Sequence, residues 1–204
     1  MSWLTKIFNR TSKIPSDSEK NWIEGCKAFD EGYRLYENKL FEKAVPFFDI
    51  AIKYEHDLKH SSMNFHERRA AGWYNLDDAY RYRAYCLQAL EFHLDAIDDF
   101  GKTIELAPDD CNLYFSRSMS KMSIYDCEGQ VSDLEKAIEL SKINNELNHE
   151  YLFNAKEMGR DSHTLIYEMQ LFAAKQRLET NLYNELREHS KATKNIYKRR
   201  FDPK

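Results

Sequence analysis

The chain has 204 residues and a formal net charge of −4, and this length is sufficient for one domain with a sizeable core. Hydrophobic residues make up 42% and charged residues 31%, as in ordinary soluble globular proteins, and no apolar run reaches the roughly 18 residues of a membrane-spanning helix. Four cysteines without a C-x-x-C pair are typical of reduced thiols, and so we expect a cytoplasmic protein. Only six glycines and four prolines favour long helices over many short strands.

The first predicted helix follows a short N-terminal segment, residues 1–15. The apolar residues of MSWLTKIFNR in that segment are too few and too interrupted for a secretory signal. Ser16 and Glu19 form an S-x-x-E capping box directly after Pro15. Because this pattern satisfies the first free amide groups of a helix, we expect a helix to begin near Asp17.

Three stretches share one pattern: a small residue, a large residue four positions later, and a second small residue three positions after that. The stretches are residues 41–57, 93–109 and 127–143. At 3.6 residues per turn the three positions lie on one helix face, so that face is predicted to pack closely against a neighbouring helix. The three triplets are Ala44, Phe48 and Ala51; Ala96, Phe100 and Thr103; and Gln130, Leu134 and Ala137.

Further residues match a known repeat. The second and third triplets lie 34 residues apart, and residues 73–80, WYNLDDAY, match W-x2-L-G-x2-Y except that an aspartate stands in for the glycine. Gly32 precedes Ala44 by twelve residues, as the motif requires, and Pro108 ends the second stretch. The chain therefore resembles the tetratricopeptide repeat (TPR) family over roughly residues 17–143. This resemblance implies an all-α fold, a tetratricopeptide-repeat helical array of about three helix–turn–helix repeats.

The predicted domain boundaries follow these repeats. The tetratricopeptide domain is expected at residues 16–144. Its three repeats are expected at residues 25–58, 63–110 and 111–144. The first and second triplets lie 52 residues apart, which is 18 more than one repeat. Eighteen residues are about five helical turns, and a longer helix absorbs them without rotating its faces. We therefore expect one elongated helix from near Met63 to near Ala89.

Residues 145–204 are predicted to hold C-terminal capping helices and a basic tail, because a terminal repeat needs a cover for its apolar face. One helix is expected to end at Gly159 and another to start at Ser162. The apolar stripe of the second helix is predicted to consist of Leu165, Met169, Phe172 and Ala173. Basic residues spaced by three or four positions would then gather on one face of a last helix. These residues are Arg187, Lys191, Lys194 and Lys198.

No sequence motif for catalysis, a cofactor or a metal is evident. The glycines are isolated, so no phosphate-binding loop is predicted, and the signatures of hydrolases and kinases do not occur. His56 and His60 are one helical turn apart. They would share a metal only with Asp57 or His66, and a polar helix end explains them more simply. The ELNH stretch at 146–149 has the spacing of di-iron bundles without the complement that they require. We therefore expect no enzyme, no cofactor and no metal site.

The resemblance also implies a binding groove, because in this family the first helix of each repeat lines a concave surface for a partner peptide or helix. Here that surface is unusually rich in aromatic side chains, which interface hot spots favour. The alternative interpretation is that several of them pack between the adjacent first helices of the repeats or against the N-terminal segment. The groove residues implied by the resemblance are Phe29, Tyr33, Tyr36, Tyr74, Asp78, Arg81, Tyr82, Tyr85, Asn112, Phe115 and Met119.

One subtype of the family holds acidic chaperone C-termini in a clamp of lysine, asparagine and arginine. The corresponding positions here carry no lysine or arginine, which argues against chaperone tails as the partner. These positions are Phe29, Tyr33, Tyr82, Asn112 and Ser116.

We therefore expect a non-catalytic protein–protein interaction module, an adaptor or scaffold, that binds a partner peptide or helix in the groove. The alternative is a nucleic-acid- or membrane-associated regulatory protein that uses the basic C-terminal tail or the amphipathic N-terminus. From Arg187 to the end the chain has seven basic and two acidic residues, whereas residues 61–110 have ten acidic and five basic ones. Because the rest of the molecule is acidic, we expect only weak, nonspecific binding to nucleic acid or to membranes.

Overall fold

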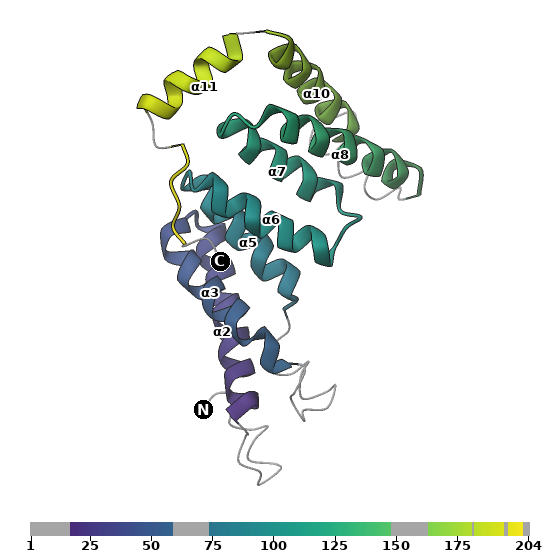
Figure 1. Cartoon of the computed structure of the whole chain (residues 1–204). Coiled ribbons are helices and arrows are strands. Elements are labelled where there is room, and N and C mark those ends of the chain that lie inside the picture. Colours follow the sequence, from purple (N-terminus) through teal and green to yellow (C-terminus); the bar gives the residue numbers. More distant parts are fainter. Residues whose placement is uncertain (1–16, 59–73, 148–162, 181, 194–195, 202–204) are drawn as a thin grey trace. The chain divides into compact units, whose positions relative to one another are not determined.

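The structure is a computed structural model of the whole chain (Figure 1). It divides into two compact units, Met1–Cys86 and Leu87–Lys204, with the division inside one helix. Every element of regular structure in the described part of the chain is a helix. The described residues are 17–58, 74–147, 163–180, 182–193 and 196–201.

The first unit is built on a pair of helices that pack along each other. The chain enters the pair at Asp17, as the capping pattern predicts, although the proposed capping residue Ser16 lies outside the described residues. Acidic residues in the first turn of the first helix suit its positive end. The helices of this unit are α2 (Asp17–Glu37), α3 (Phe41–Leu58) and most of α5 (Leu76–Ala89).

The second unit continues with helices that pack in chain order. The α6 helix contacts α7, α7 contacts α8, and α8 contacts α10. Figure 1 shows α7 and α8 side by side, with α10 next to α8. The helices are α6 (His93–Leu106), α7 (Cys111–Ser123), α8 (Cys127–Leu147), α10 (His163–Glu179) and α11 (Leu182–Thr193).

Three turns, after α2, α5 and α7, have the same geometry. Each has a central residue in the left-handed region, Lys39, Glu91 or Tyr125, with φ of 59°, 63° and 61°. The next residue donates its N–H to the carbonyl five positions back, which is the helix-closing Schellman pattern. The bonds run from Leu40 to Leu35 (2.9 Å), from Phe92 to Leu87 (2.8 Å) and from Asp126 to Lys121 (2.9 Å).

The helix that follows each of these turns buries its predicted triplet. All nine residues of the three triplets have an exposed fraction of 0%. The prediction that this face packs closely is therefore confirmed for α3, α6 and α8. Figure 1 shows these helices running beside the ones that precede their turns in α2–α3 and α7–α8.

Gly32 of α2 lies close to α3. A Cβ atom at this position would lie 3.1 Å from Cε1 of Phe48 and 3.2 Å from Cβ of Phe47. Those distances are shorter than most real Cβ contacts, so an alanine at this position would require the two phenylalanines to shift by a few tenths of an ångström. The small residue that the repeat motif requires at this point thus has a packing reason.

The elongated helix from Met63 to Ala89 is wrong as predicted. The α5 helix begins at Leu76, and Tyr74 and Asn75 before it are not helical. Residues 59–73 lie outside the described part of the chain. The error came from extending an apolar periodicity through a stretch without a capping signal of its own.

The sequence correctly predicts a helix that begins near Ser162, but it predicts the wrong buried face for this helix. The α10 helix begins at His163, next to the predicted cap Ser162, which is not described. Two residues of its predicted apolar stripe are mostly exposed, Met169 at 65% and Phe172 at 66%. Tyr167 and Ala174 are buried instead. Both faces of α10 carry apolar residues, and so sequence periodicity did not decide which face packs.

The predicted basic stripe does not form on one helix. The α11 helix ends at Thr193, and residues 196–201 are not helical, so Lys198 lies off the helix. The predicted helix end at Gly159 and the predicted segment 1–15 fall outside the described residues.

Candidate functional site

Four tyrosines from two helices form one aromatic surface in the first unit, which we call the tyrosine surface: Tyr33, Tyr36, Tyr82 and Tyr85. On α2 the spacing of Phe29 and the two tyrosines, four and then three residues, puts them on one helix face. On α5 the two tyrosines are three residues apart and again share a face. All four side chains are partly exposed.

Tyr82 lies at the centre of this surface. Its ring meets the ring of Tyr33 edge to face and lies close to that of Tyr36, which are favourable aromatic geometries. A ring held by several others has little rotational freedom, so the surface is preorganised. The centroid distances from Tyr82 are 4.8 Å to Tyr33, 5.1 Å to Tyr36, 6.1 Å to Phe29, 6.1 Å to Phe48 and 6.4 Å to Tyr85.

A second layer of rings supports the tyrosine surface from below. Tyr74, predicted as a groove residue, is buried and donates its hydroxyl to the carbonyl oxygen of Ala51 at 2.6 Å. It stacks on Phe29 with a centroid distance of 5.1 Å. Phe48, known from the sequence only as a repeat position, is fully buried under Tyr82. Because Phe48 is the large residue of the first triplet, the sequence indicated that it would be buried, but not that it would support Tyr82.

The hydroxyl groups of Tyr33, Tyr36 and Tyr82 stay protonated at neutral pH. Burial raises the pKa of Tyr82 to about 12, and burial also raises the pKa of Tyr36. A hydrogen bond with Glu37, followed by burial, raises the pKa of Tyr33. These phenols are therefore neutral and able to donate hydrogen bonds.

Two charged residues predicted for the groove precede Tyr82 on α5. Burial, and then the charge of Asp77, raises the pKa of Asp78, while Asn75 donates to its carboxylate at 3.4 Å. The guanidinium of Arg81 lies 3.8 Å from the carboxylate of Asp77. Together with Glu37 on α2, these groups place more negative than positive charge around the aromatic rings.

The remaining predicted groove residues belong to the second unit, on α7. Asn112 accepts a hydrogen bond from the Tyr167 hydroxyl at 2.8 Å, and the Phe115 ring stacks on that of Tyr167 at 4.7 Å. Both side chains therefore pack against Tyr167 of α10. Met119, one turn further along α7, is partly buried.

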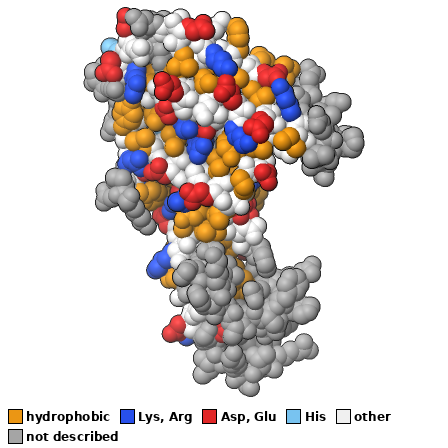
Figure 2. Space-filling view, turned by 45° about the vertical axis from the view of Figure 1, so that its right-hand side comes forward, with side chains coloured by type: hydrophobic (Ala, Val, Ile, Leu, Met, Phe, Trp, Pro, Cys, Tyr) orange, Lys and Arg blue, Asp and Glu red, His pale blue; other side chains and the backbone are white. Residues whose placement is uncertain are grey.

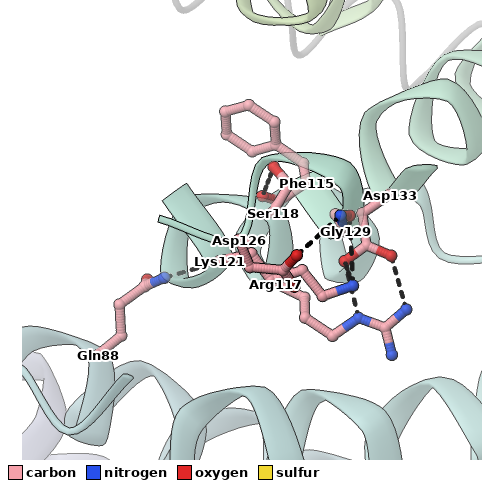
Figure 3. A network of polar contacts seen from close by, with 9 residues as sticks. Gln88, Phe115, Arg117, Ser118, Lys121, Asp126, Gly129 and Asp133 are labelled. Atoms are coloured by element: carbon pink, nitrogen blue, oxygen red, sulfur yellow. Dashed lines mark hydrogen bonds and ion pairs between the residues drawn. The ribbon is translucent and has the colours of Figure 1, made fainter. Parts of the chain in front are cut away.

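The other side of α7 carries a polar network with α8 (Figure 3). Arg117 donates two hydrogen bonds to the carboxylate of Asp133, at 2.9 and 2.7 Å, and Lys121 lies 2.8 Å from the same carboxylate. Asp133 is buried, so its charge depends on these two cations. Nearby, Gln88 of α5 donates to the hydroxyl of Ser120 at 2.8 Å. The cations of α7 thus hold the hairpin together.

Two of the buried thiols, Cys26 and Cys86, do not resemble nucleophiles. Burial raises the pKa of Cys26 to about 12, with a smaller contribution from Asp30, and burial raises that of Cys86 to about 12. Thiols with such values stay protonated at neutral pH. Among the described residues no group of three metal-binding side chains gathers. The side chains of His56, His60 and the ELNH stretch fall outside the described part of the chain.

A polar recess of about 380 Å³ lies in the second unit, between the start of α8 and the end of α10. Its lining holds two basic and two acidic side chains, so their formal charges cancel. The charged lining residues are Arg177, Arg187, Asp126 and Glu128. Asp126 is already engaged, since its carboxylate accepts the N–H of Gly129 at 3.0 Å.

On the face drawn in Figure 2, acidic and basic side chains are interspersed with hydrophobic ones, and neither charge sign forms one large patch. Within the described ranges, no helix combines the length and the hydrophobicity that crossing a bilayer requires. Comparison of the chain with protein-family models finds no match. Comparison with curated proteins finds none either.

Proposed function

We propose that this chain is a non-catalytic protein-interaction module of the tetratricopeptide type, which binds a peptide or helix of a partner protein on its tyrosine surface. The observation that carries the proposal is the arrangement of four partly exposed tyrosines around Tyr82. Tyrosine is among the residues that dominate binding energy at protein interfaces. Its ring supplies contact area, and its hydroxyl supplies a hydrogen bond, at little cost in conformational entropy.

The repeat architecture supports the same proposal. Three identical turns, each followed by a helix with a buried triplet, are what stacked helix–turn–helix repeats require. In the family that the sequence resembles, the first helices of the repeats line the binding groove. The tyrosine surface stands on α2, a first helix, and on α5, which occupies the same place before the second of these turns.

The chemistry around the rings supports a partner segment with apolar and cationic side chains. Neutral phenols offer ring faces to aliphatic groups and to guanidinium or ammonium groups. Glu37 and Asp78 add carboxyl groups beside Tyr33 and Tyr82, as the effects on the pKa values of those tyrosines indicate. An acidic segment would meet repulsion at the same place, which agrees with the lack of a clamp for acidic tails.

The test compares proteins captured by the wild-type chain and by single variants from extracts of its native cells. Tyr36→Ala and Tyr85→Ala remove rings of the tyrosine surface. Tyr80→Ala is the matched control, because it removes a ring from the same helix as Tyr85 outside this surface. We expect the first two variants to keep their helical circular dichroism and to lose the proteins that the wild type and the control capture.

A loss of about 1–2 kcal/mol per residue, which is a fivefold to thirtyfold weakening, is expected for hot-spot residues. Captured proteins that stay bound to both folded surface variants would contradict the proposal. If both variants unfold, the alternative interpretation holds and the rings are core.

The alternative function, binding of nucleic acid or membranes through the basic tail, has less support. The guanidinium of Arg199 lies 2.7 Å from the carboxylate of Asp98, and the ammonium group of Lys198 lies 3.8 Å from that of Glu91. Cations that are paired with carboxylates attract phosphate less strongly.

A further inference from the structure

The C-terminal tail, residues 196–201, returns to the start of α6 within the second unit (Figure 1). The tail is not helical. Its polar groups form hydrogen bonds near the turn after α7 and with the first turn of α6. The Tyr197 hydroxyl donates to the carbonyl oxygen of Ile124 at 3.3 Å. The backbone N–H of Arg200 donates to the carboxylate of Asp95 at 2.6 Å. The tail is therefore bound much as an extended peptide ligand would be.

The surface under the tail is acidic, and we call it the acidic notch: Glu91, Phe92, Asp95 and Asp98. Arg199 joins two of its carboxylates, at 3.2 Å from Asp95 and 2.7 Å from Asp98. The ammonium group of Lys198 lies 4.6 Å from the ring centroid of Phe92, within cation–π range. Each member of the notch thus meets a cation of the tail.

Asp95 is the residue of the notch that the tail covers most completely. With the tail in place its side chain is only 3% exposed, and it accepts hydrogen bonds from the guanidinium of Arg199 and from the N–H of Arg200. A buried carboxylate needs hydrogen-bond donors, and here the tail supplies them. Asp95 stands in the first turn of α6, where the helix dipole favours its negative charge. The carboxylate of Asp95 therefore favours a bound segment that carries a cation.

The tail is suited to exchange. Its contacts include hydrogen bonds, ion pairs and a cation–π contact, which a segment of the same composition would reproduce. The asymmetry of charge along the chain also favours this pairing, since residues 61–110 have an excess of acids and the last residues an excess of bases.

We propose that the acidic notch is a docking site for a basic extended segment of a partner protein, and that the chain's own tail is the internal occupant which such a segment displaces. The fitting segment has an aromatic residue followed by consecutive basic residues, as in the tail sequence YKRR. Nucleic acid is not a fitting occupant, because the notch presents carboxylates. This site lies on other residues than the tyrosine surface and stands or falls independently of it.

The test uses a fluorescent peptide with the sequence of residues 194–204, KNIYKRRFDPK, titrated by fluorescence anisotropy. The receptors are the full-length wild type and the full-length Arg199→Ala variant, whose own tail is weakened. We expect the variant to bind the peptide at least about tenfold more tightly, because a tethered occupant competes at a high effective concentration. Binding should weaken as salt rises from about 0.05 to 0.3 M, since screening reduces these ion pairs.

Two further variants locate the binding. Asp98→Asn, added to Arg199→Ala, removes an exposed carboxylate of the notch and should reduce peptide binding by about tenfold or more. Glu105→Gln in the same background is the matched control, because it removes an exposed carboxylate of the same helix outside the notch. A peptide with alanine in place of its arginines should not bind.

Three results would overturn the proposal, each in protein whose helical circular dichroism is unchanged. The first is no binding of the peptide to the Arg199→Ala variant. The second is equal affinity for the wild type and this variant, which would mean that the tail does not occupy the site. The third is binding that Asp98→Asn leaves unchanged, or a duplex DNA that competes with the peptide.

Discussion

The helices α2 and α7 precede turns of the same geometry, and the helices after those turns bury the same kind of triplet, yet the two hairpins use their other side chains differently. On α2, aromatic rings gather toward α5 and remain partly exposed around Tyr82. On α7, Arg117 and Lys121 turn onto the buried Asp133 of α8. One scaffold thus carries an aromatic face in the first unit and a charged interhelical network in the second.

The difference shows that two helix pairs with similar turns can use their remaining side chains in different ways. Where α2 meets α3, Gly32 and the buried Phe48 pack closely, and the tyrosines lie beside this contact and stay partly exposed. Where α7 meets α8 and α10, the charged residues and Phe115 are all used in internal contacts. Recognition is therefore expected on the first unit, and stability of the second unit should depend on its ion pairs.

The shared scaffold itself gives the largest expected effect. Ala96 is fully buried in the second triplet, so Ala96→Glu both overpacks the helix interface and buries a charge. We expect a loss of about 4 kcal/mol or more in the free energy of unfolding, measured by urea denaturation. The control is Glu105→Ala, which changes an exposed residue of the same helix that pairs with Lys102 on the surface. This control should change the free energy of unfolding by less than about 0.5 kcal/mol. Equal small changes would refute the assigned helix faces.

The charged side of the comparison is tested at Asp133. Asp133→Ala leaves Arg117 and Lys121 half-buried without their shared carboxylate, so we expect a loss of about 3–5 kcal/mol in the free energy of unfolding. Asp49→Ala breaks the more exposed pair with Arg83 in the first unit and should cost about 1 kcal/mol or less. If the two variants lose the same stability, the second unit does not depend on its ion pairs.

The aromatic side of the comparison is tested by comparing the stability lost in Tyr82→Ala with that lost in Tyr85→Ala. Tyr82 lies against several rings and is expected to lose about 2–4 kcal/mol of stability on substitution by alanine. Tyr85 lies at the edge, 6.2 Å from Tyr36 and 6.4 Å from Tyr82, and should lose about 1 kcal/mol or less. Thermal unfolding followed by circular dichroism measures both. A larger loss for Tyr85→Ala would mean that it is a core residue and not part of an accessible surface.

The smallest expected effect concerns the shared turns. Lys39 holds a left-handed conformation that favours glycine, with φ of 59°, and its side chain is exposed. Lys39→Gly should therefore raise the free energy of unfolding by about 0.5–1 kcal/mol. Lys43→Gly, at an exposed position inside α3, is the contrasting variant and should lower it by about 1 kcal/mol. A loss of stability in both variants would argue against strain at the turn.

Much of the fold could be predicted because helix periodicity and small residues reflect packing directly. The buried triplets followed from spacing, the start of α2 from a capping box, and the end of α6 from Pro108. The start of α5 and the buried face of α10 did not, because propensity and apolar content there fit more than one arrangement. Tertiary contacts, which a local pattern does not contain, decided between them.

The candidate site could be predicted in part for the same reason. Spacing placed the tyrosines of α2 and α5 on common faces, but it did not tell exposed rings from buried ones. Tyr74 and Asn112 meet partners that are distant in sequence, Ala51 and Tyr167. The docking of the tail on Asp95 joins residues more than one hundred positions apart. The opposite charge of the two regions was the available signal for it.

The most direct test of the proposed interaction surface is a measured affinity. A random peptide library is selected on the wild-type chain, and the dissociation constants of the enriched peptides are determined by fluorescence anisotropy for folded Tyr36→Ala, Tyr85→Ala and Tyr80→Ala. The account predicts peptides rich in apolar and basic residues whose affinity falls at least about fivefold in the first two variants and stays unchanged in the third. Enriched peptides that bind all three variants as tightly as the wild type would contradict it.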